Sequence, residues 1–184
     1  MKIFIDTEFT DFINQDLISI GAVAENGETF YGENAEFKRA WSSQFVKDNI
    51  YPLLNMDKFG MRRVELASRL WAWMEEFDCD ITIVVDYLGD SELLNHLFQD
   101  DHPKIQEHHL IKMVIWNKCA NYFLPENEEK FKLVFNKMTN AFKTHLNEYF
   151  LVTGEHPHHS LSDAKANREA YLRVFKDFQN KVYF

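Results

Sequence analysis

The chain has 184 residues, of which 46% are hydrophobic and 15% aromatic, with 17 Phe but only 6 Gly and 4 Pro. This composition is typical of a single compact domain spanning residues 1–184, and it excludes a disordered or linker-rich architecture. The formal net charge of −9 argues against tight, non-specific binding of long duplexes through a broad basic face. This net charge is still compatible with a nucleic-acid substrate if metal ions offset the negative charge of a carboxylate site.

No segment carries the pattern of an export signal or a membrane span. Asp6 and Glu8 interrupt the first apolar run, which excludes a signal peptide, and no stretch approaches the roughly 20 apolar residues that cross a bilayer. Cys79 and Cys119 are far apart and fit no metal-ligand spacing. We therefore expect reduced thiols, a cytoplasmic location and no membrane partner.

The N-terminal part of the chain predicts three antiparallel strands. Residues 2–6, Leu17–Ala24 and 29–31 are short apolar or β-rich runs. Asn26 and Gly27 separate the last two runs, and this pair is the strongest short hairpin signal because both turn residues must reach positive φ.

Helices and two more strands are expected in the rest of the chain. Residues 36–50 predict a helix that ends near Pro52, and residues 62–77 predict a second helix with apolar side chains at helical spacing. The later predicted elements are a strand (81–85), a helix that begins at Asp90, a strand (110–116), a long amphipathic helix (126–150) and a C-terminal helix (162–180). This order predicts an α/β protein with a mixed five-stranded sheet flanked by helices, and it is compatible with a ribonuclease H-like fold.

Two acids, Asp6 and Glu8, stand at the end of the first predicted strand. Side chains two residues apart on a strand point to the same face, so these carboxylates would lie side by side. Neighbouring carboxylates repel each other unless a positive charge lies between them, and in proteins a bound hard cation commonly supplies that charge. The competing interpretation is a strand end that enters solvent, where acids are common.

Two further acids, Asp90 and Asp163, stand where helices are expected to begin. Asp90 follows the fourth predicted strand, and Asp86 is a competing candidate four residues earlier. Asp163 follows a His-rich loop, with Ser162 as the expected cap and His158 five residues before it. Because Asp is a favoured capping residue, each segment alone indicates no more than a helix start.

Taken together and in this order, the four acids and the histidine resemble the DEDDh superfamily of 3′–5′ exonucleases, which includes oligoribonuclease, RNase T and polymerase proofreading subunits. The Asp-x-Glu motif of that superfamily matches Asp6 and Glu8, and its second motif matches Asp90. Its His-x(4)-Asp motif matches His158 and Asp163.

The chain resembles more closely a branch of small stand-alone bacterial 3′–5′ exoribonucleases. The matching segments are Asp6-Thr7-Glu8-Phe9, Leu17-Ile18-Ser19-Ile20-Gly21, Val23-Ala24-Glu25 and the segment from His158 to Ala164. Asp86 departs from the pattern because relatives often have Asn there, and His159 adds a second candidate base. Residues 95–150 match no motif of the family.

The resemblance implies hydrolysis at the 3′ end of a nucleic acid, RNA favoured over DNA, with release of 5′-mononucleotides. Two Mg²⁺ or Mn²⁺ ions about 3.5–4 Å apart would clamp the attacking and leaving oxygens. Asp6 would bridge both ions, Glu8 and Asp163 would complete the first position, and Asp90 would serve the second. His158 would act as the general base. Stand-alone relatives are often dimers, so the resemblance is compatible with a homodimer, although the sequence does not determine the oligomeric state.

Aromatic residues next to the first motif are the candidates for holding the substrate. Phe9 and Phe12 could stack on bases, each contact contributing about 1–3 kcal/mol, although core packing is the competing interpretation. Thr7 is the third substrate-binding candidate. Four basic residues are candidates for phosphate contacts, with a solvated surface as the alternative: Lys112, Lys118, Lys165 and Arg168.

Two other functions fit parts of the pattern. A haloacid dehalogenase-like phosphatase has a strand that ends in Asp-x-Asp-x-Thr, but here Glu8 occupies the second acid position, and that family has no use for the C-terminal His-x(4)-Asp. A catalytically silent nuclease-like module that binds an RNA end or a protein is the other alternative. Competent residues at all five motif positions argue against it.

Overall fold

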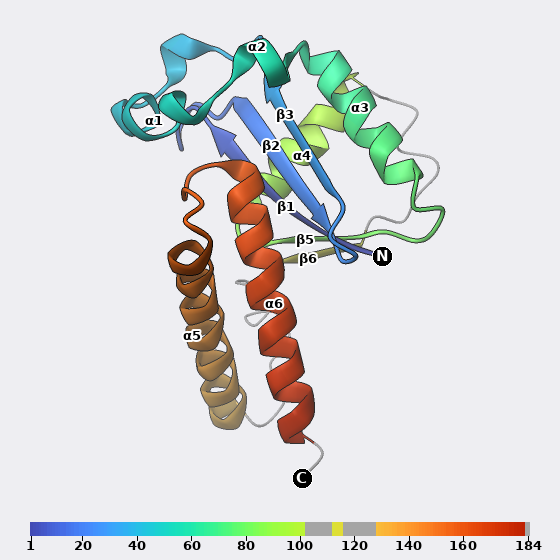
Figure 1. The fold of residues 1–184 in the computed structure, drawn as a ribbon, viewed down its shortest axis with the longest axis vertical. Helices are drawn as coiled ribbons and strands as arrows, with labels where there is room; N and C mark the ends of the chain where they lie inside the picture. Colours follow the sequence, from blue (N-terminus) through green and yellow to red (C-terminus); the bar gives the residue numbers. More distant parts are fainter. Residues whose placement is uncertain (102–111, 116–127, 183–184) are drawn as a thin grey trace.

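The computed structural model describes residues 1–101, 112–115 and 128–182 (Figure 1). A mixed sheet with the strand order β4-β3-β2-β1-β5-β6 forms its centre. The strands are β1 (Lys2–Phe9), β2 (Leu17–Ala24), β3 (Thr29–Asn34), β4 (Gly60–Met61), β5 (Thr82–Val85) and β6 (Lys112–Ile115). β1, β2 and β3 are antiparallel neighbours, and β5 runs parallel to both β1 and β6. The predicted α/β, ribonuclease H-like arrangement is confirmed, and the two-residue strand β4 extends the five predicted strands by one.

Helices flank this sheet. They are α1 (Gln44–Asn49), α2 (Met56–Phe59), α3 (Arg63–Glu75), α4 (Leu88–Asp101), α5 (Glu128–Thr153) and α6 (Ser160–Val182), with 3-10 helices at Arg39–Trp41 and Tyr51–Leu53. Across the described part of the chain, none of the helices is both long and apolar enough to cross a membrane. Cys119, Lys118 and the ends of the predicted strand 110–116 lie outside the described residues, as does the side chain of Lys112.

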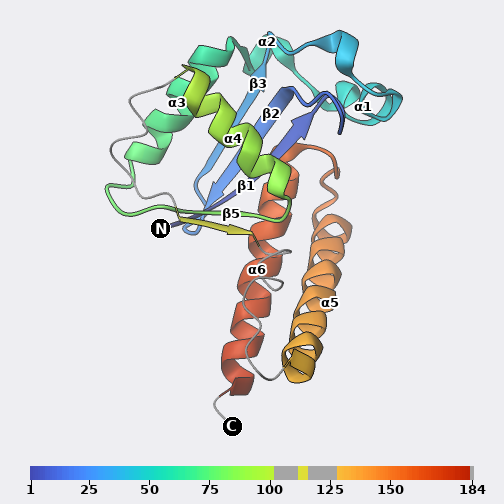
Figure 2. The same ribbon diagram turned by 180° about the vertical axis from the view of Figure 1, so that it is seen from behind.

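Alternation along β1 divides the core into two layers. Ile3 and Ile5 pack with buried residues of α3 and α4 on one face of the sheet. Phe4 points to the other face, where its ring lies 5.1 Å from the ring of Tyr171 in α6. Figure 1 shows α6 in front of the sheet with α5 beside it, and the reverse view in Figure 2 brings α4 to the front. The molecule is therefore a sheet between two layers of helices.

The single helix predicted for residues 36–50 is wrong. Ser43 ends the irregular chain before α1, because its Oγ accepts a hydrogen bond from the backbone N–H of Val46 at 3.3 Å. The backbone N–H of Ser43 donates to the carbonyl of Thr10 at 2.9 Å, which ties this segment to the loop after β1. A contact with a distant part of the chain therefore overrides the local helical pattern.

The predicted starts of two helices are also wrong. α4 begins at Leu88 and α6 at Ser160, each two residues before the predicted position. Asp90 and Asp163 consequently lie inside the first turn of their helices, and Ser162 is not the cap. This places both carboxylates at helix N-termini, beside the ends of the central strands.

Candidate metal centre and active site

The first two acids face the layer of α6. Since Phe4 faces α6, Asp6 and Glu8 share its side of β1, and Thr7 faces the opposite side, towards α4. Glu8 is only 9% exposed, and both carboxylates lie near the C-terminal end of the strand. The alternation predicted from the sequence thus holds within β1.

A close approach between β2 and α6 brings Asp163 to these acids. Gly21 lies opposite Asp6 in the sheet, and a Cβ atom at Gly21 would overlap the backbone of α6 at Ser160. Glycine is therefore required for α6 to lie directly against the strand pair. Asp163, in the first turn of α6, reaches the acids of β1 as a result.

A second set of acids comes from the end of β5 and the start of α4. The Thr7 hydroxyl donates to Asp90 Oδ1 at 2.6 Å, and the Thr7 backbone N–H donates to the same oxygen at 3.2 Å. Asp90 Oδ2 is buried and has no hydrogen-bond partner among the described residues. Asp86 directly follows β5, whose register pairs Val84 with Phe4, so the chain emerges beside Asp6. The buried, unsatisfied oxygen of Asp90 is the kind of atom that a ligand is expected to satisfy.

The acids form two groups that share one member. One carboxylate oxygen from each of Asp6, Glu8 and Asp163 lies within 4.8 Å of the others, and the same holds for Asp6, Asp86 and Asp90. Among the residues whose side chains the structure describes, no other three potential ligands come this close together. The clusters could hold divalent cations, with Asp6 able to contact two of them.

The electrostatics of these groups favour bound cations. Burial raises the pKa of Glu8 to about 8, with smaller contributions from the charges of Asp163 and Asp90. Burial likewise raises the pKa of Asp90 and of Asp163 to about 7, and it raises that of Asp6 well above its ordinary value. Among the described residues that line the cavity there is no Lys or Arg. Oxygen donors without a protein counter-charge suit Mg²⁺ or Mn²⁺.

The acids open into a cavity of about 760 Å³ whose other walls are largely aromatic and aliphatic. Phe9, Phe12 and Tyr87 form a ring cluster, with centroids 5.3 Å apart for the two Phe rings and 6.0 Å apart for the stacked pair of Phe9 and Tyr87. Phe12 is 76% exposed, so packing in the core does not explain it. A cavity of this size is typical of ligand pockets.

The two neighbouring histidines have different surroundings. His158 lines the cavity, has a positive φ of 65°, and lies edge-on to the ring of Phe45 at 5.1 Å. His159 turns away and stacks on Tyr31 at 4.6 Å, and burial lowers its pKa. The Asp163 carboxylate accepts hydrogen bonds from the backbone of both histidines, which couples this acid to the loop.

The remaining candidates divide between the cavity and other partners. The hydroxyl of Thr7 is engaged with Asp90, so in this structure Thr7 orients an acid instead of presenting a free group. Lys165 pairs with Glu155 at 3.0 Å, and the Arg168 guanidinium donates to the carbonyls of Ala24 and Glu25. Neither cation lines the cavity.

Several lining residues were not singled out from the sequence, and Tyr87, Phe45 and Asn167 are among them. Tyr87 adjoins Asp86 and could have been found as an aromatic residue next to a candidate acid. Asn167 stands four residues after Asp163, a spacing that places both on one face of a helix. Phe45 carries no local signal, because the irregular chain before α1 determines its position.

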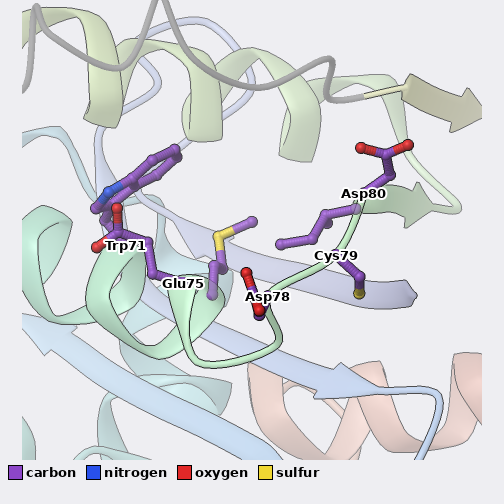
Figure 3. Close-up of a pocket in the computed structure, with 7 residues that line it drawn as sticks. Trp71, Glu75, Asp78, Cys79 and Asp80 are labelled. Atoms are coloured by element: carbon purple, nitrogen blue, oxygen red, sulfur yellow. The ribbon is translucent and has the colours of Figure 1, made fainter.

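A second hollow, of about 340 Å³, lies at the N-terminal end of β5 (Figure 3). It is lined by Trp71 and Glu75 of α3 and by Asp78, Cys79 and Asp80 in the loop that follows. Figure 3 shows the three carboxylates spread around the hollow and pointing in different directions. In the described part of the chain they form no group of three within ligand distance. This hollow therefore lacks the features of the acid-lined cavity.

Comparison with known proteins gives limited similarity. No protein-family model matches the chain. Two curated proteins of Mycobacterium tuberculosis, one from strain CDC 1551 / Oshkosh and one from strain ATCC 25618 / H37Rv, are each named 3′–5′ exoribonuclease. Each is 30% identical over 95 residues, an alignment that covers 42% of this chain and 56% of the relative. The chain thus spans about half the length of the curated relatives it matches.

Proposed function

We propose that the chain is a divalent-metal-dependent 3′–5′ exonuclease of the DEDDh type that removes nucleotides from RNA 3′ ends. The observation that carries the proposal is that Asp6 belongs to both carboxylate groups. A two-metal phosphodiesterase needs such a shared ligand to keep its ions close together. The names of the two similar proteins support the same activity and favour RNA over DNA.

Asp6, Glu8 and Asp163 would hold one cation, and Asp6 with Asp90 the other. When bound, Mg²⁺ or Mn²⁺ would supply the positive charge that offsets the transferring phosphoryl group. The acidic lining explains why cations are needed, because without them the cavity would repel a phosphodiester. The net charge of −9 favours short or end-on substrates over long tracked ones.

His158 is the proposed general base. It would accept a proton from the attacking water as the water oxygen bonds to the terminal phosphorus. The bond from phosphorus to the O3′ of the preceding nucleotide breaks, and that oxygen takes up a proton. The products are a 5′-mononucleotide and a strand with a new 3′-hydroxyl. Phe9 and Phe12 would stack on the terminal base at the cavity mouth.

The test uses 5′-labelled RNA and DNA oligomers with Mg²⁺, Mn²⁺, Ca²⁺ or EDTA. We expect a stepwise ladder and 5′-mononucleotides with Mg²⁺ or Mn²⁺, little turnover with Ca²⁺, and none in EDTA. A 3′-phosphate should block the reaction, because the pocket is expected to admit a free hydroxyl. Full activity in EDTA, or internal cuts in a circular substrate, would contradict the proposal.

A further inference from the structure

Asp86 has no role in the proposed metal site, whose ligands are Asp6, Glu8, Asp90 and Asp163. One of its carboxylate oxygens lies within 4.8 Å of ligand oxygens of Asp6 and Asp90, and burial raises its pKa. Buried carboxylates repel one another at such distances, so their convergence destabilises the fold unless a cation joins them. The position of Asp86 is therefore difficult to explain as a surface acid.

Asn167 gives a separate indication that this position binds a ligand. Its side chain is hydrogen-bonded to Asp86, and the residue is only 6% exposed. An ionised carboxylate can only accept, so the amide NH₂ must face Asp86 and the amide oxygen must point elsewhere. That oxygen is buried without a hydrogen-bond partner among the described residues, and Asn167 lines the cavity. An unsatisfied buried acceptor in the cavity indicates a hydrated cation or another donor there.

We infer that Asp86 is a fifth carboxylate ligand, at the second cation position, and that Asn167 is the positioning residue that orients it. The inference rests on the proposed two-metal function and deepens it. Each cation position then has three carboxylates, with Asp6 common to both. Three protein ligands fix the second cation before the substrate arrives, whereas two would leave it dependent on the phosphate oxygens of the substrate. The protein alone should therefore bind two cations.

The test is a Mn²⁺ titration of the full chain without nucleic acid, by calorimetry and by the electron paramagnetic resonance signal of free Mn²⁺. We expect two Mn²⁺ ions per wild-type chain. Asp86→Asn keeps the side-chain shape but removes the charge, and it should weaken one of the two sites by about tenfold or more while the other is unchanged. Asp80→Asn is the matched control, since it removes one acid from the hollow of Figure 3. It should leave both sites unchanged.

Asn167→Ala tests the positioning role. It should weaken the same Mn²⁺ site by about tenfold, the scale at which supporting residues act on metal affinity. In the Asp86→Asn background it should add little, because two residues that act through one contact are not additive. Full additivity would show that Asn167 does not act through Asp86. Rescue by Asn167→Gln is not expected, because the longer side chain displaces the amide.

The outcomes separate this inference from the proposed function. Two unchanged Mn²⁺ sites in Asp86→Asn would overturn the inference even where RNA is degraded. Equal weakening by Asp86→Asn and Asp80→Asn would also overturn it, because general charge would then account for the effect. Selective loss in Asp86→Asn, in a protein that degrades neither RNA nor DNA, would support the inference and overturn the nuclease. If Asp86→Asn fails to fold, Asn167→Ala carries the same test.

Discussion

The cavity at the C-terminal ends of β1 and β5 and the hollow at the N-terminal end of β5 are both lined by acids. In the hollow, Glu75, Asp78 and Asp80 come from a helix end and a loop, and all three are exposed. In the cavity, the five converging acids come from β1, from the chain directly after β5, and from the first turns of α4 and α6. Glu8 and Asp90 are buried, and Asp6, Asp86 and Asp163 are half-buried. Exposed carboxylates on a loop can turn away from one another, whereas those on packed elements cannot.

The comparison shows that the number of acids around a hollow does not define a metal site. What distinguishes the cavity is convergence under burial, which raises the pKa of Glu8 to about 8 and leaves Asp90 Oδ2 unsatisfied. A substitution in the cavity should therefore be compared with a matched substitution elsewhere in the molecule.

The largest effect is expected from Asp6→Ala. This substitution removes the ligand shared by both groups, so the exonuclease rate should fall by more than the roughly 10²–10³-fold that follows the loss of one stabilising donor. Asp80→Ala, in the hollow, should leave the rate unchanged. Single-turnover rates on 5′-labelled RNA, with circular dichroism to check folding, measure both. Comparable losses of rate in the two variants would contradict the assignment of the active site to the cavity.

His158→Ala should have the next largest effect. The loss of a general base typically lowers the rate by about 10²–10⁴-fold, while Mn²⁺ affinity should remain near normal because carboxylates bind the metal. His159→Ala is the matched control and should change the rate only a few fold, since His159 stacks on Tyr31 outside the cavity. A large loss of rate in His159→Ala, with a nearly normal rate in His158→Ala, would show that His159 is the base and His158 is not.

Much of the fold could be predicted because local patterns and tertiary packing agree. The apolar runs of β1, β2 and β5 and the helical spacing in α3 each have a length and a period that permit one interpretation. Strand geometry alone predicts that the side chains of Asp6 and Glu8 point to the same face of the sheet. The remaining acids could be proposed only through their order along the chain, because an Asp at a helix start is also an ordinary cap.

The rest of the fold and site depends on contacts between distant residues. The segment around Ser43 has a helical pattern, but its hydrogen bond to Thr10 prevents the long helix. The need for glycine at position 21 arises from the backbone of α6 at Ser160, which is 139 positions later in the chain. The contact between Asp86 and Asn167 likewise joins the chain directly after β5 to α6. In each of these contacts the two partners are far apart in the sequence, so the local sequence around one partner does not predict the contact.

A smaller effect is expected from Phe12→Ala. Loss of one base-stacking ring costs about 1–3 kcal/mol, so KM should rise by roughly 5- to 150-fold with a smaller change in kcat. Ile13→Ala is the matched control, because Ile13 is 88% exposed, adjoins Phe12 and does not line the cavity. Steady-state kinetics on an RNA oligomer measure both variants. An unchanged KM in Phe12→Ala would show that the exposed ring does not contact the base.

The smallest effect concerns the stability of the metal-free protein. Burial raises the pKa of Glu8 to about 8 and that of Asp90 to about 7, above the value of about 4 that carboxylates have in the unfolded chain. Between about pH 4 and pH 8 the folded state thus binds more protons than the unfolded state. Its free energy of unfolding therefore falls as the pH rises through this window. In EDTA we expect these acids to lower the Tm by several degrees from about pH 5.5 to pH 8, since 1 kcal/mol corresponds to about 2–4 °C in a domain of this size.

Asp90→Asn isolates this contribution. Other acids act in the opposite direction, since the hydrogen bond from Lys2 lowers the pKa of Glu25, but they act equally in both proteins. The wild-type Tm in EDTA should therefore fall more steeply with pH than that of Asp90→Asn, and the variant should be the more stable protein at pH 8. Asp80→Asn should keep the wild-type slope. Saturating Mn²⁺ should reverse the order at pH 8, because cations that bind only the folded state stabilise it in proportion to their affinity for the ionised acids. Equal slopes for wild type and Asp90→Asn would mean that folding does not raise the pKa of Asp90, and the case for a cation between the acids would then rest on their positions alone.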